Sequence, residues 1–427
     1  MKLVLVFIFV LIITSLGFCA EIIVKPNSKV DCSKEIQKAL DACFASGGGV
    51  IDLGSGQYRL DNPIKIPSGV TLAGVWQGPH HTELDKGTVI MAYAGRGKEN
   101  DPPLIKLEPS STVKGMTIYY PEQTPDNIVP YPWTIQGSGM HPSVMDITIP
   151  NCYNGIDFGT YTNELHYIRN VYGAPLNLGV YIDKCTDIGR VENVHFNMHY
   201  WTRAEPDKPQ SYWDPLFSHS YQNVTGFKIG RSDWEMFSNT FIITAKIGYH
   251  FMSDTYGASC GVFSQIACDY SQIPILVEQT QPAGISITNG QFVAGDAAHY
   301  ESIVKTSPTF TGNVKFSNTN FWGPAFQIAD IEGNGHISFN QCNFSSWPFA
   351  KKTGVLLDVK GGSVTVTDCV MAKEWDIIKL GKDVDSAIIK DNTFASAMNF
   401  ENNADDADVI FKDNVIRKKA PDYVDNK

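Results

Sequence analysis

The sequence predicts an all-β fold, a parallel β-helix solenoid, because one short phrase returns through the last third of the chain. Each copy has an alternating apolar strand, then a turn residue, then a large apolar residue. The copies end at Phe292, Phe321, Phe344, Met371, Phe394 and Ile416. The ends are 22 to 29 residues apart, which is shorter than a propeller blade of roughly 40 residues and typical of stacked repeats.

The turn residues favour the same architecture. Three positions before each end lies an amide or carboxylate side chain: Asn289, Asn318, Gln341, Asp368, Asp391 and Asp413. Asn and Asp tolerate left-handed backbone angles at turns, while inward positions of stacked parallel strands are filled by Ile, Val and Phe. We therefore expect these residues to form one line of corners along the axis. A β-sandwich of short strands is the alternative, but it would not repeat turn chemistry in register.

One amphipathic helix is predicted at residues 31–49, before the first coil. The i, i+3, i+4, i+7 spacing of a single helix face is met by Ile36, Ala39, Leu40 and Cys43. Asp31 or Ser33 can cap its start, and the glycines at 47–49 end it. Because open strand edges pair with other molecules, we expect this short helix to cap the N-terminal end of the solenoid.

The segment that includes this helix resembles a known superfamily. Residues 31–74, DCSKEIQKALDACFASGGGVIDLGSGQYRLDNPIKIPSGVTLAG, are similar to the N-terminal stretch of the pectate-lyase-like proteins. The similarity is to the rhamnogalacturonase/epimerase-like branch related to glycoside hydrolase family 28. Beyond this run the resemblance continues as coil rhythm to about residue 416. It implies a right-handed parallel β-helix in enzymes that cut acidic or neutral polysaccharides, and the segments 50–60, 63–66 and 69–72 are expected to be its first strands.

The catalytic motifs of that superfamily do not carry over. Polygalacturonases have Asn-Thr-Asp, Asp-Asp, Gly-His-Gly and Arg-Ile-Lys. This chain has only Gly335-His336 followed by Ile, Ile389-Lys390 without the Arg, and Asp405-Asp406 in a polar stretch. The Asp-His and Arg-x-Pro-x-x-Arg motifs of pectate lyases are missing as well. The resemblance therefore implies a fold and a substrate class, and it names no catalytic residue.

The N-terminus and the charge indicate an exported protein. Residues 1–20 have the Lys2 start, short apolar run and small residues of a signal peptide, and a lipid anchor at Cys19 is the weaker alternative. The mature chain, residues 21–427, is then secreted or periplasmic. It is expected to be one domain, with coils at 50–416 and a polar tail at 417–427. The net charge of −11 without a basic stretch argues against nucleic acid, and no later segment is long enough to insert into a membrane.

The mature chain keeps eight cysteines, and they are expected to be buried thiols. Cys342 and Cys369 occupy the same position in successive repeats, so they should stack on neighbouring coils about 4.8 Å apart. A bridge is conceivable at that spacing, but parallel Cβ directions favour an unoxidised ladder. No pair has the CxxC spacing of a zinc site.

Two segments interrupt the coil rhythm and are interpreted as long loops. Residues 119–141 are rich in proline and tyrosine, and residues 197–222 are rich in aromatic and histidine side chains. Long loops in compact domains are often functional, and aromatic faces suit sugar rings. The predicted substrate-binding residues from the second segment are Trp201, Trp213, Tyr221 and His199. A hydrophobic plug that fixes the loop to the coils is an equally good interpretation of them.

A carboxylate pair follows directly. If residues 231–237 form one strand, Asp233 and Glu235 point to the same side, with Trp234 and Met236 in the core. Residues two apart on a strand lie roughly 6.6 Å apart, near the separation of the two carboxyls in inverting glycosidases. Asp233 and Glu235 are therefore the predicted catalytic pair, in a cleft walled by the two loops. Arg231 is expected to bind an anionic substrate group. An exposed charged face is the competing interpretation.

Three functions remain open at this stage. The first is a glycoside hydrolase that acts on a plant or algal polysaccharide by carboxylate acid/base catalysis and needs no cofactor. The second is a β-eliminating lyase, for which calcium is possible. The third is a non-catalytic carbohydrate-binding or surface protein. The expected partner in each case is a polysaccharide, and the sequence does not predict an oligomeric state.

Overall fold

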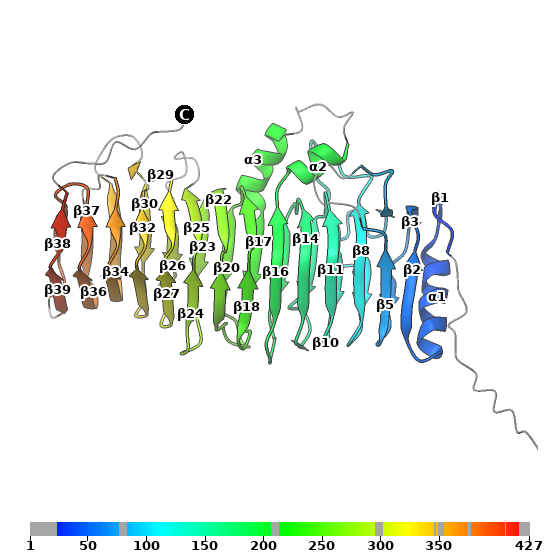
Figure 1. The fold of residues 1–427 in the computed structure, drawn as a ribbon, viewed down its shortest axis with the longest axis horizontal. Coiled ribbons are helices and arrows are strands. Elements are labelled where there is room, and N and C mark those ends of the chain that lie inside the picture. Colours follow the sequence, from blue (N-terminus) through cyan, green and yellow to red (C-terminus); the bar gives the residue numbers. More distant parts are fainter. Residues whose placement is uncertain are drawn as a thin grey trace, which may run out of the picture.

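The predicted parallel β-helix is confirmed by a computed structural model, which describes residues 24–76, 83–205, 213–294, 302–345, 347–348, 354–373, 377–405 and 407–417. Thirty-six of the strands in these residues belong to one sheet whose neighbours pair in parallel. The coils stack along a single axis, as Figure 1 shows. The predicted signal peptide and nearly all of the predicted tail lie outside the described residues.

Each full coil has three strand positions, which we call faces A, B and C. Face A is formed by β2 (Gly49–Leu53), β5 (Val70–Gly74), β8 (Thr112–Tyr119), β11 (Ser143–Ile149), β14 (Tyr167–Gly173), β16 (Arg190–Phe196), β18 (Glu235–Ser238), β21 (Gly261–Ser264), β24 (Ile285–Thr288), β27 (Asn313–Ser317), β31 (His336–Asn340), the second halves of β34 (Val355–Thr367) and β36 (Ile377–Lys390), and β39 (Asp408–Lys412).

Face B follows face A after a sharp corner. It is formed by β3 (Gly56–Leu60), β6 (Thr88–Ala92), the ends of β8, β11, β14 and β16, and then β19 (Phe241–Ile243), β22 (Ala267–Ser271), β25 (Gln291–Ala294), β28 (Asn320–Trp322), β32 (Asn343–Phe344), β35 (Val370–Met371), β37 (Thr393–Phe394) and β40 (Val415–Ile416).

Face C closes each coil. It is formed by β4 (Ile64–Ile66), β7 (Ile105–Leu107), β9 (Trp133–Gly137), β12 (Asn154–Phe158), β15 (Leu178–Ile182), β17 (Thr225–Ile229), β20 (Ile247–Phe251), β23 (Ile273–Val277), β26 (Ser302–Thr306), β30 (Gln327–Ile331), the first halves of β34 and β36, and β38 (Asn399–Asn402). Two small ladders, β10 (Gly139–Met140) with β13 (Asn163–Glu164) and β29 (Pro324–Ala325) with β33 (Trp347–Pro348), lie outside the main sheet.

The A–B corner is the line of turn residues that the repeats predict. All six predicted residues have positive φ, from 49° at Asn318 to 59° at Asp391. Amide side chains on neighbouring coils form a hydrogen-bonded ladder at this corner, in which Asn318 Nδ2 donates to Asn289 Oδ1 at 2.7 Å. The same corner extends into earlier coils, where Asn193 Nδ2 donates to Asn170 Oδ1 at 2.9 Å. The left-handed turn that Asn tolerates therefore sets the shape of most coils.

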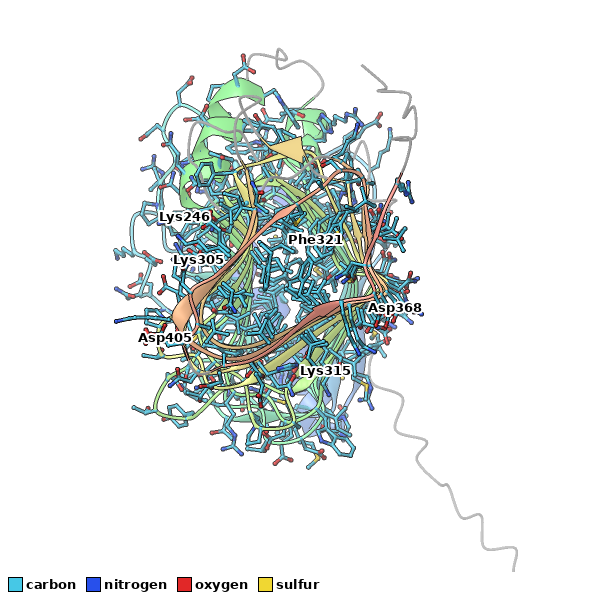
Figure 2. All side chains as sticks on the ribbon, turned by 90° about the vertical axis from the view of Figure 1, so that its left-hand side faces the viewer. Lys246, Lys305, Lys315, Phe321, Asp368 and Asp405 are labelled. Carbon is cyan, nitrogen blue, oxygen red and sulfur yellow. The ribbon has the colours of Figure 1, made fainter. Side chains whose placement is uncertain are left out.

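The core is a column of apolar side chains inside the coils. Phe321, which points inward in Figure 2, stacks on Phe292 with ring centroids 5.8 Å apart and on Phe344 at 5.2 Å. Asp368 lies on the outside in the same view. The eight mature cysteines are buried free thiols, as predicted, and Cys342 N donates to Cys369 Sγ on the next coil.

The capping helix is confirmed with shorter bounds than predicted. Helix α1 (Ser33–Ala45) packs on β2, β4 and β5 and buries the predicted face. Residues before it form β1 (Asn27–Asp31), and Asp31 Oδ1 accepts a hydrogen bond from the Ser33 N–H at 3.0 Å. After the helix, Gly47, Gly48 and Gly49 all have positive φ, which only glycine adopts without strain.

Two predicted loops and one predicted strand differ from the structure. Residues 119–141 contain β9 and β10, because the four prolines all lie at positions 121–132, before β9 begins. Residues 197–222 contain α2 (His199–Ala204) and most of α3 (Trp213–Asn223). Residues 50–60 form two strands, β2 and β3, because Gly54 and Ser55 make a corner. No helix in the described residues is long and apolar enough to cross a membrane.

Candidate functional site

The turns that lead from face C to face A carry the most distinctive surface of the molecule. These C–A turns lie along the lower edge of the solenoid in Figure 1, where β10 is labelled. Three of them, at residues 230–234, 252–260 and 278–284, come from successive coils. Together they form a pocket of about 460 Å³ lined by Arg231, Asp233, Trp234, Tyr256, Gly257, Ala258, Cys260, Gln281 and Ala283.

A second pocket, of about 270 Å³, shares Trp234, Cys260 and Ala283 with the first. We call the two pockets together the Trp234 groove. Trp234 is 65% exposed and has a φ of 63°, which is uncommon for a bulky side chain. Its N–H donates to Cys260 Sγ at 3.4 Å. The turn therefore holds a large aromatic face in solvent between two hollows, at a cost in backbone strain.

The polar groups of the groove are fixed in position. Arg231 Nη2 lies 3.0 Å from Asp233 Oδ2, and Gln281 Nε2 donates to Asp233 Oδ1 at 2.5 Å. Asp233 is thus held from two different coils, because Gln281 belongs to the turn after β23. Both the arginine and the aspartate are about one-third exposed, so a ligand in the groove can reach them.

The predicted pairing of Asp233 with Glu235 is wrong. Residues 231–234 are a turn, and β18 begins at Glu235. The left-handed Trp234 reverses the alternation that an extended strand would have. Glu235 is therefore fully buried, while Trp234 and Met236, which we expected in the core, are exposed.

Glu235 belongs to a buried polar cluster beneath the groove. Its Oε1 lies 3.2 Å from His166 Nε2, and Ser232 Oγ donates to its Oε2. Burial disfavours an imidazolium, but the adjacent Glu235 carboxylate outweighs burial and raises the pKa of His166 to about 10. Cys185 completes the cluster. In the described part of the chain, His166, Cys185 and Glu235 form the one group of three potential metal ligands within 4.8 Å of one another.

The predicted aromatic platforms lie elsewhere. Trp201 is fully buried and Tyr221 is 6% exposed, so neither presents a face for a sugar. His199 and Trp213 stack on each other with ring centroids 4.3 Å apart. Helices α2 and α3 follow face B and rise from the upper edge in Figure 1, whereas the Trp234 groove is on the lower edge. In the described residues, therefore, Asp233 and Glu235 do not lie on the floor of a cleft between the two loops.

Lysines beside aromatic rings continue the surface toward the N-terminal coils. Lys184 lies over the Tyr256 ring at 4.6 Å, Lys228 over Tyr181 at 5.5 Å, and Lys106 over Tyr161 at 5.5 Å. Within the described residues, none of these three lysines is in an ion pair, in contrast to lysines such as Lys65, Lys98 and Lys360. We call the three lysines and their rings the lysine–tyrosine track.

Sequence reasoning missed one further acidic group, Asp183. Its Oδ1 accepts the Arg231 N–H at 2.7 Å, and the Tyr181 hydroxyl donates to its Oδ2 at 3.2 Å. Burial raises the pKa of Asp183, and the nearby Asp254 carboxylate adds to the effect. The only sequence signal for this region is that the C–A turns vary in length and composition from coil to coil.

Comparisons with known proteins agree with this geometry at the level of fold. No protein-family model matches the sequence, and a search of curated proteins finds no match either. Among solved structures, the catalytic unit of a thermostable GH87 alpha-1,3-glucanase from Streptomyces thermodiastaticus is similar. It has 12% identity, a TM-score of 0.51, and coverage of 92% of this chain and 67% of that one. The chain has a parallel β-helix fold, and its relationship to the pectate-lyase-like superfamily rests on the sequence resemblance. The narrower relationship to glycoside hydrolase family 28 stays a prediction.

Two other β-helices have lower scores. The A-module of the mannuronan C-5 epimerase AlgE6 of Azotobacter vinelandii has 13% identity and a TM-score of 0.45, covering 91% of this chain and 96% of that one. The tailspike protein of E. coli bacteriophage HK620, in complex with a pentasaccharide, has 12% identity and a TM-score of 0.46, covering 90% and 75%.

Proposed function

We propose that this protein binds a polysaccharide along its C–A turns, with Trp234 as the stacking platform. The observation that carries the proposal is an indole that is 65% exposed between two pockets. Sugar-binding sites combine an apolar surface with a few fixed polar groups. Here the Arg231–Asp233 pair and Gln281 supply the polar groups, and Asp233 is held in place by both partners.

The lysine–tyrosine track supports an acidic polysaccharide as the ligand. A lysine that lies over a ring and has no carboxylate partner offers its charge to an anionic group. Tyr256 and Tyr161, which are 53% and 47% exposed, offer ring surface beside Lys184 and Lys106. A chain of uronic acids or sulfated sugars needs both features in alternation. Binding of such a chain should weaken with added salt, because exposed charges are screened.

Hydrolysis of the bound chain is the second candidate function, and Asp183 favours it. Hydrolysis needs one group that keeps its proton and one carboxylate that accepts a proton. Asp183 has a raised pKa, and Asp233 is a carboxylate at the pocket. Because Asp183 is fully buried, a proton from it would pass through Tyr181, whose oxygen lies 3.2 Å from Asp183 Oδ2. Protonated Asp183 would donate to the Tyr181 oxygen while the Tyr181 hydroxyl gives its own proton to the leaving oxygen. Asp183 would then act through Tyr181 as a positioning residue.

The binding proposal is tested by electrophoresis through gels that contain polygalacturonate, alginate or the neutral glucan laminarin. Trp234→Ala should weaken retention at least about tenfold, the usual scale for an aromatic anchor that becomes covered on binding. Trp322→Ala is the matched control, because Trp322 is 44% exposed on β28 of face B. Equal retention of both variants and the parent would contradict the assignment of Trp234.

The reaction is tested on any polymer that the protein retains. Hydrolysis yields new reducing ends without ultraviolet absorbance, whereas β-elimination yields both, because it leaves a double bond. Tyr181→Phe should lower hydrolysis by at least about 10²-fold and leave retention unchanged. Retention without either product would contradict hydrolysis and support polysaccharide binding as the only function of this surface.

Export stays a prediction, and mass spectrometry of secreted material should show a chain that starts near residue 21.

A further inference from the structure

The buried cluster beneath the groove contains three different kinds of metal ligand from three successive C–A turns. His166 precedes β14, Cys185 follows β15, and Glu235 opens β18. The turns are in register, since Asn163 pairs with Cys185 and Cys185 with Ser232 in parallel bridges. All three side chains are fully buried. Their positions therefore follow from the stacking of the coils, and no loop rearrangement is needed to bring them together.

The hydrogen bonds around His166 leave one nitrogen directed at the centre of the cluster. Asn163 Nδ2 donates to the carbonyls of Phe158 and Asp183, at 2.5 Å and 2.9 Å. Its Oδ1 consequently faces His166 Nδ1 at 2.8 Å and accepts that N–H. A ring N–H donated to an amide oxygen is the usual support of a metal-bound histidine. In the neutral ring, Nε2 then carries a lone pair.

In the neutral ring that lone pair would face an acceptor, whereas the protonated ring, which the raised pKa of His166 favours, donates its Nε2–H to the same acceptor. His166 Nε2 lies 3.2 Å from Glu235 Oε1, and an ionised carboxylate has no proton to donate. Two acceptors at this distance require a positive species between them, which is either a proton or a metal ion. Ser232 Oγ donates to the other carboxylate oxygen, Oε2, so Oε1 is the oxygen left for that species.

The backbone beside these atoms leaves room that any other residue would fill. A Cβ at Gly189 would lie 2.2 Å from His166 Nε2 and 2.4 Å from Glu235 Oε2. The φ of Gly189 is not positive, so backbone conformation does not explain why a glycine is needed at this position. The requirement is space next to His166 Nε2 and the Glu235 carboxylate.

We propose that His166 Nε2, Cys185 Sγ and Glu235 Oε1 bind a zinc-type divalent ion. Zinc binds Cys, His and carboxylate ligands at about 2.0–2.3 Å, so two ligand atoms on one ion lie at most about 4.6 Å apart. One ligand atom from each of the three residues lies within 4.8 Å of the other two, so a small approach of the side chains would bring all three within that limit. Calcium and magnesium prefer oxygen ligands, which a sulfur–nitrogen–oxygen set does not supply. Binding would release two protons, one shared by His166 and Glu235 and one from the Cys185 thiol.

Such a centre would fix the turn that carries Arg231, Asp233 and Trp234 to the two preceding coils. It does not depend on the proposed polysaccharide function, because it concerns the buried side of the turn. Three protein ligands leave further coordination positions, which zinc sites commonly fill with water.

The test uses the full mature chain, freed of metal by a chelator and then desalted after incubation with ZnCl₂ or CoCl₂. We expect inductively coupled plasma mass spectrometry to find about one retained zinc ion per chain. The cobalt form should show a sulfur-to-cobalt charge-transfer absorption. Cys185→Ser and His166→Ala should each reduce retained metal at least tenfold. Cys268→Ser should retain it, because Cys268 is an equally buried thiol outside the cluster.

Three outcomes would overturn the proposal. The first is a parent chain that retains no zinc after desalting. The second is a cobalt form without the sulfur band. The third is a Cys185→Ser variant that binds as much metal as the parent. If Cys185→Ser fails to fold, the cobalt spectrum of the parent decides, because the band requires a thiolate ligand. A buried His166–Glu235 pair that shares only a proton would give the first outcome.

Discussion

The A–B corner and the C–A turns lie at two edges of the same coils, and they use sequence in different ways. At the A–B corner, two residues separate the strands and a left-handed Asn, Asp or Gln recurs, as at Asn289, Asn318 and Gln341. The C–A turns at 230–234 and 252–260 differ in length and composition. The first edge repeats because it must keep the coils in register. The second is free to vary, and it carries the groove, the buried cluster and the part of the lysine–tyrosine track that is formed by Lys184, Tyr256 and Tyr161.

The largest expected effect tests whether the C–A turns, the variable edge of the solenoid, also stabilise the fold. Gly189→Ala places a methyl group against His166 and Glu235, both fully buried. We expect it to lower the free energy of unfolding by about 3 kcal/mol, as for overpacking in a core. Chemical denaturation measures this. Gly54→Ala, at an exposed corner with nothing near the added Cβ, should change stability by less than about 0.5 kcal/mol. Similar values for the two would mean that the cluster is loosely packed.

A somewhat smaller effect is expected at the uniform edge. Asn318→Val puts a β-branched residue at a φ of 49° and removes the hydrogen bond to Asn289. We expect a loss of about 2 kcal/mol in unfolding free energy, since left-handed backbone alone costs roughly 1–2 kcal/mol. Asn318→Gly loses the same hydrogen bond without the strain. If the glycine variant is as unstable as the valine variant, the ladder of side chains and not the backbone conformation sets this corner.

The smallest expected effect is a pH dependence from face C. Burial lowers the pKa of His250, although Glu278 Oε1, 2.8 Å from its Nε2, opposes the shift. Below the unfolded value of about 6.5, the unfolded chain binds more protons than the folded one. Stability should therefore fall as the pH drops below about 6.5, by at most about 1.4 kcal/mol per pH unit.

Thermal unfolding across this pH range measures the effect of His250. His250→Gln should flatten the dependence, while His141→Gln, at an exposed position, should leave it unchanged. A steeper loss in His250→Gln than in the parent would show that the sign is wrong.

The same contrast explains what the sequence could predict. The A–B corner and the capping helix were predictable because one phrase recurs and one helix face is apolar. The pairing of Asp233 with Glu235 failed because a single left-handed residue, Trp234, inverts the alternation of a strand. No local pattern indicates that conformation at a tryptophan. The prediction that Trp201 and Tyr221 bind substrate failed for another reason. Aromatic residues in a long insertion fill the space beneath it as readily as they face solvent.

The contacts between residues far apart in the sequence could not be predicted for a related reason. His166 and Glu235 are 69 residues apart, and Gln281 and Asp233 are 48 apart. Their pairing depends on how many residues each intervening coil contains. The insertion that holds α2 and α3 makes one coil much longer than its neighbours, so positions counted from the repeat period do not align across it.

The central claim, that the variable edge is the binding surface, is tested most directly by hydrogen exchange with mass spectrometry. The parent protein is compared with and without the polysaccharide that it retains best. We predict slower exchange at residues 230–234, 252–260 and 278–284, and no change at the A–B corner around Asn289, Asn318 and Gln341. Protection at the A–B corner or around α2 and α3, with unchanged exchange at the three C–A turns, would contradict the account.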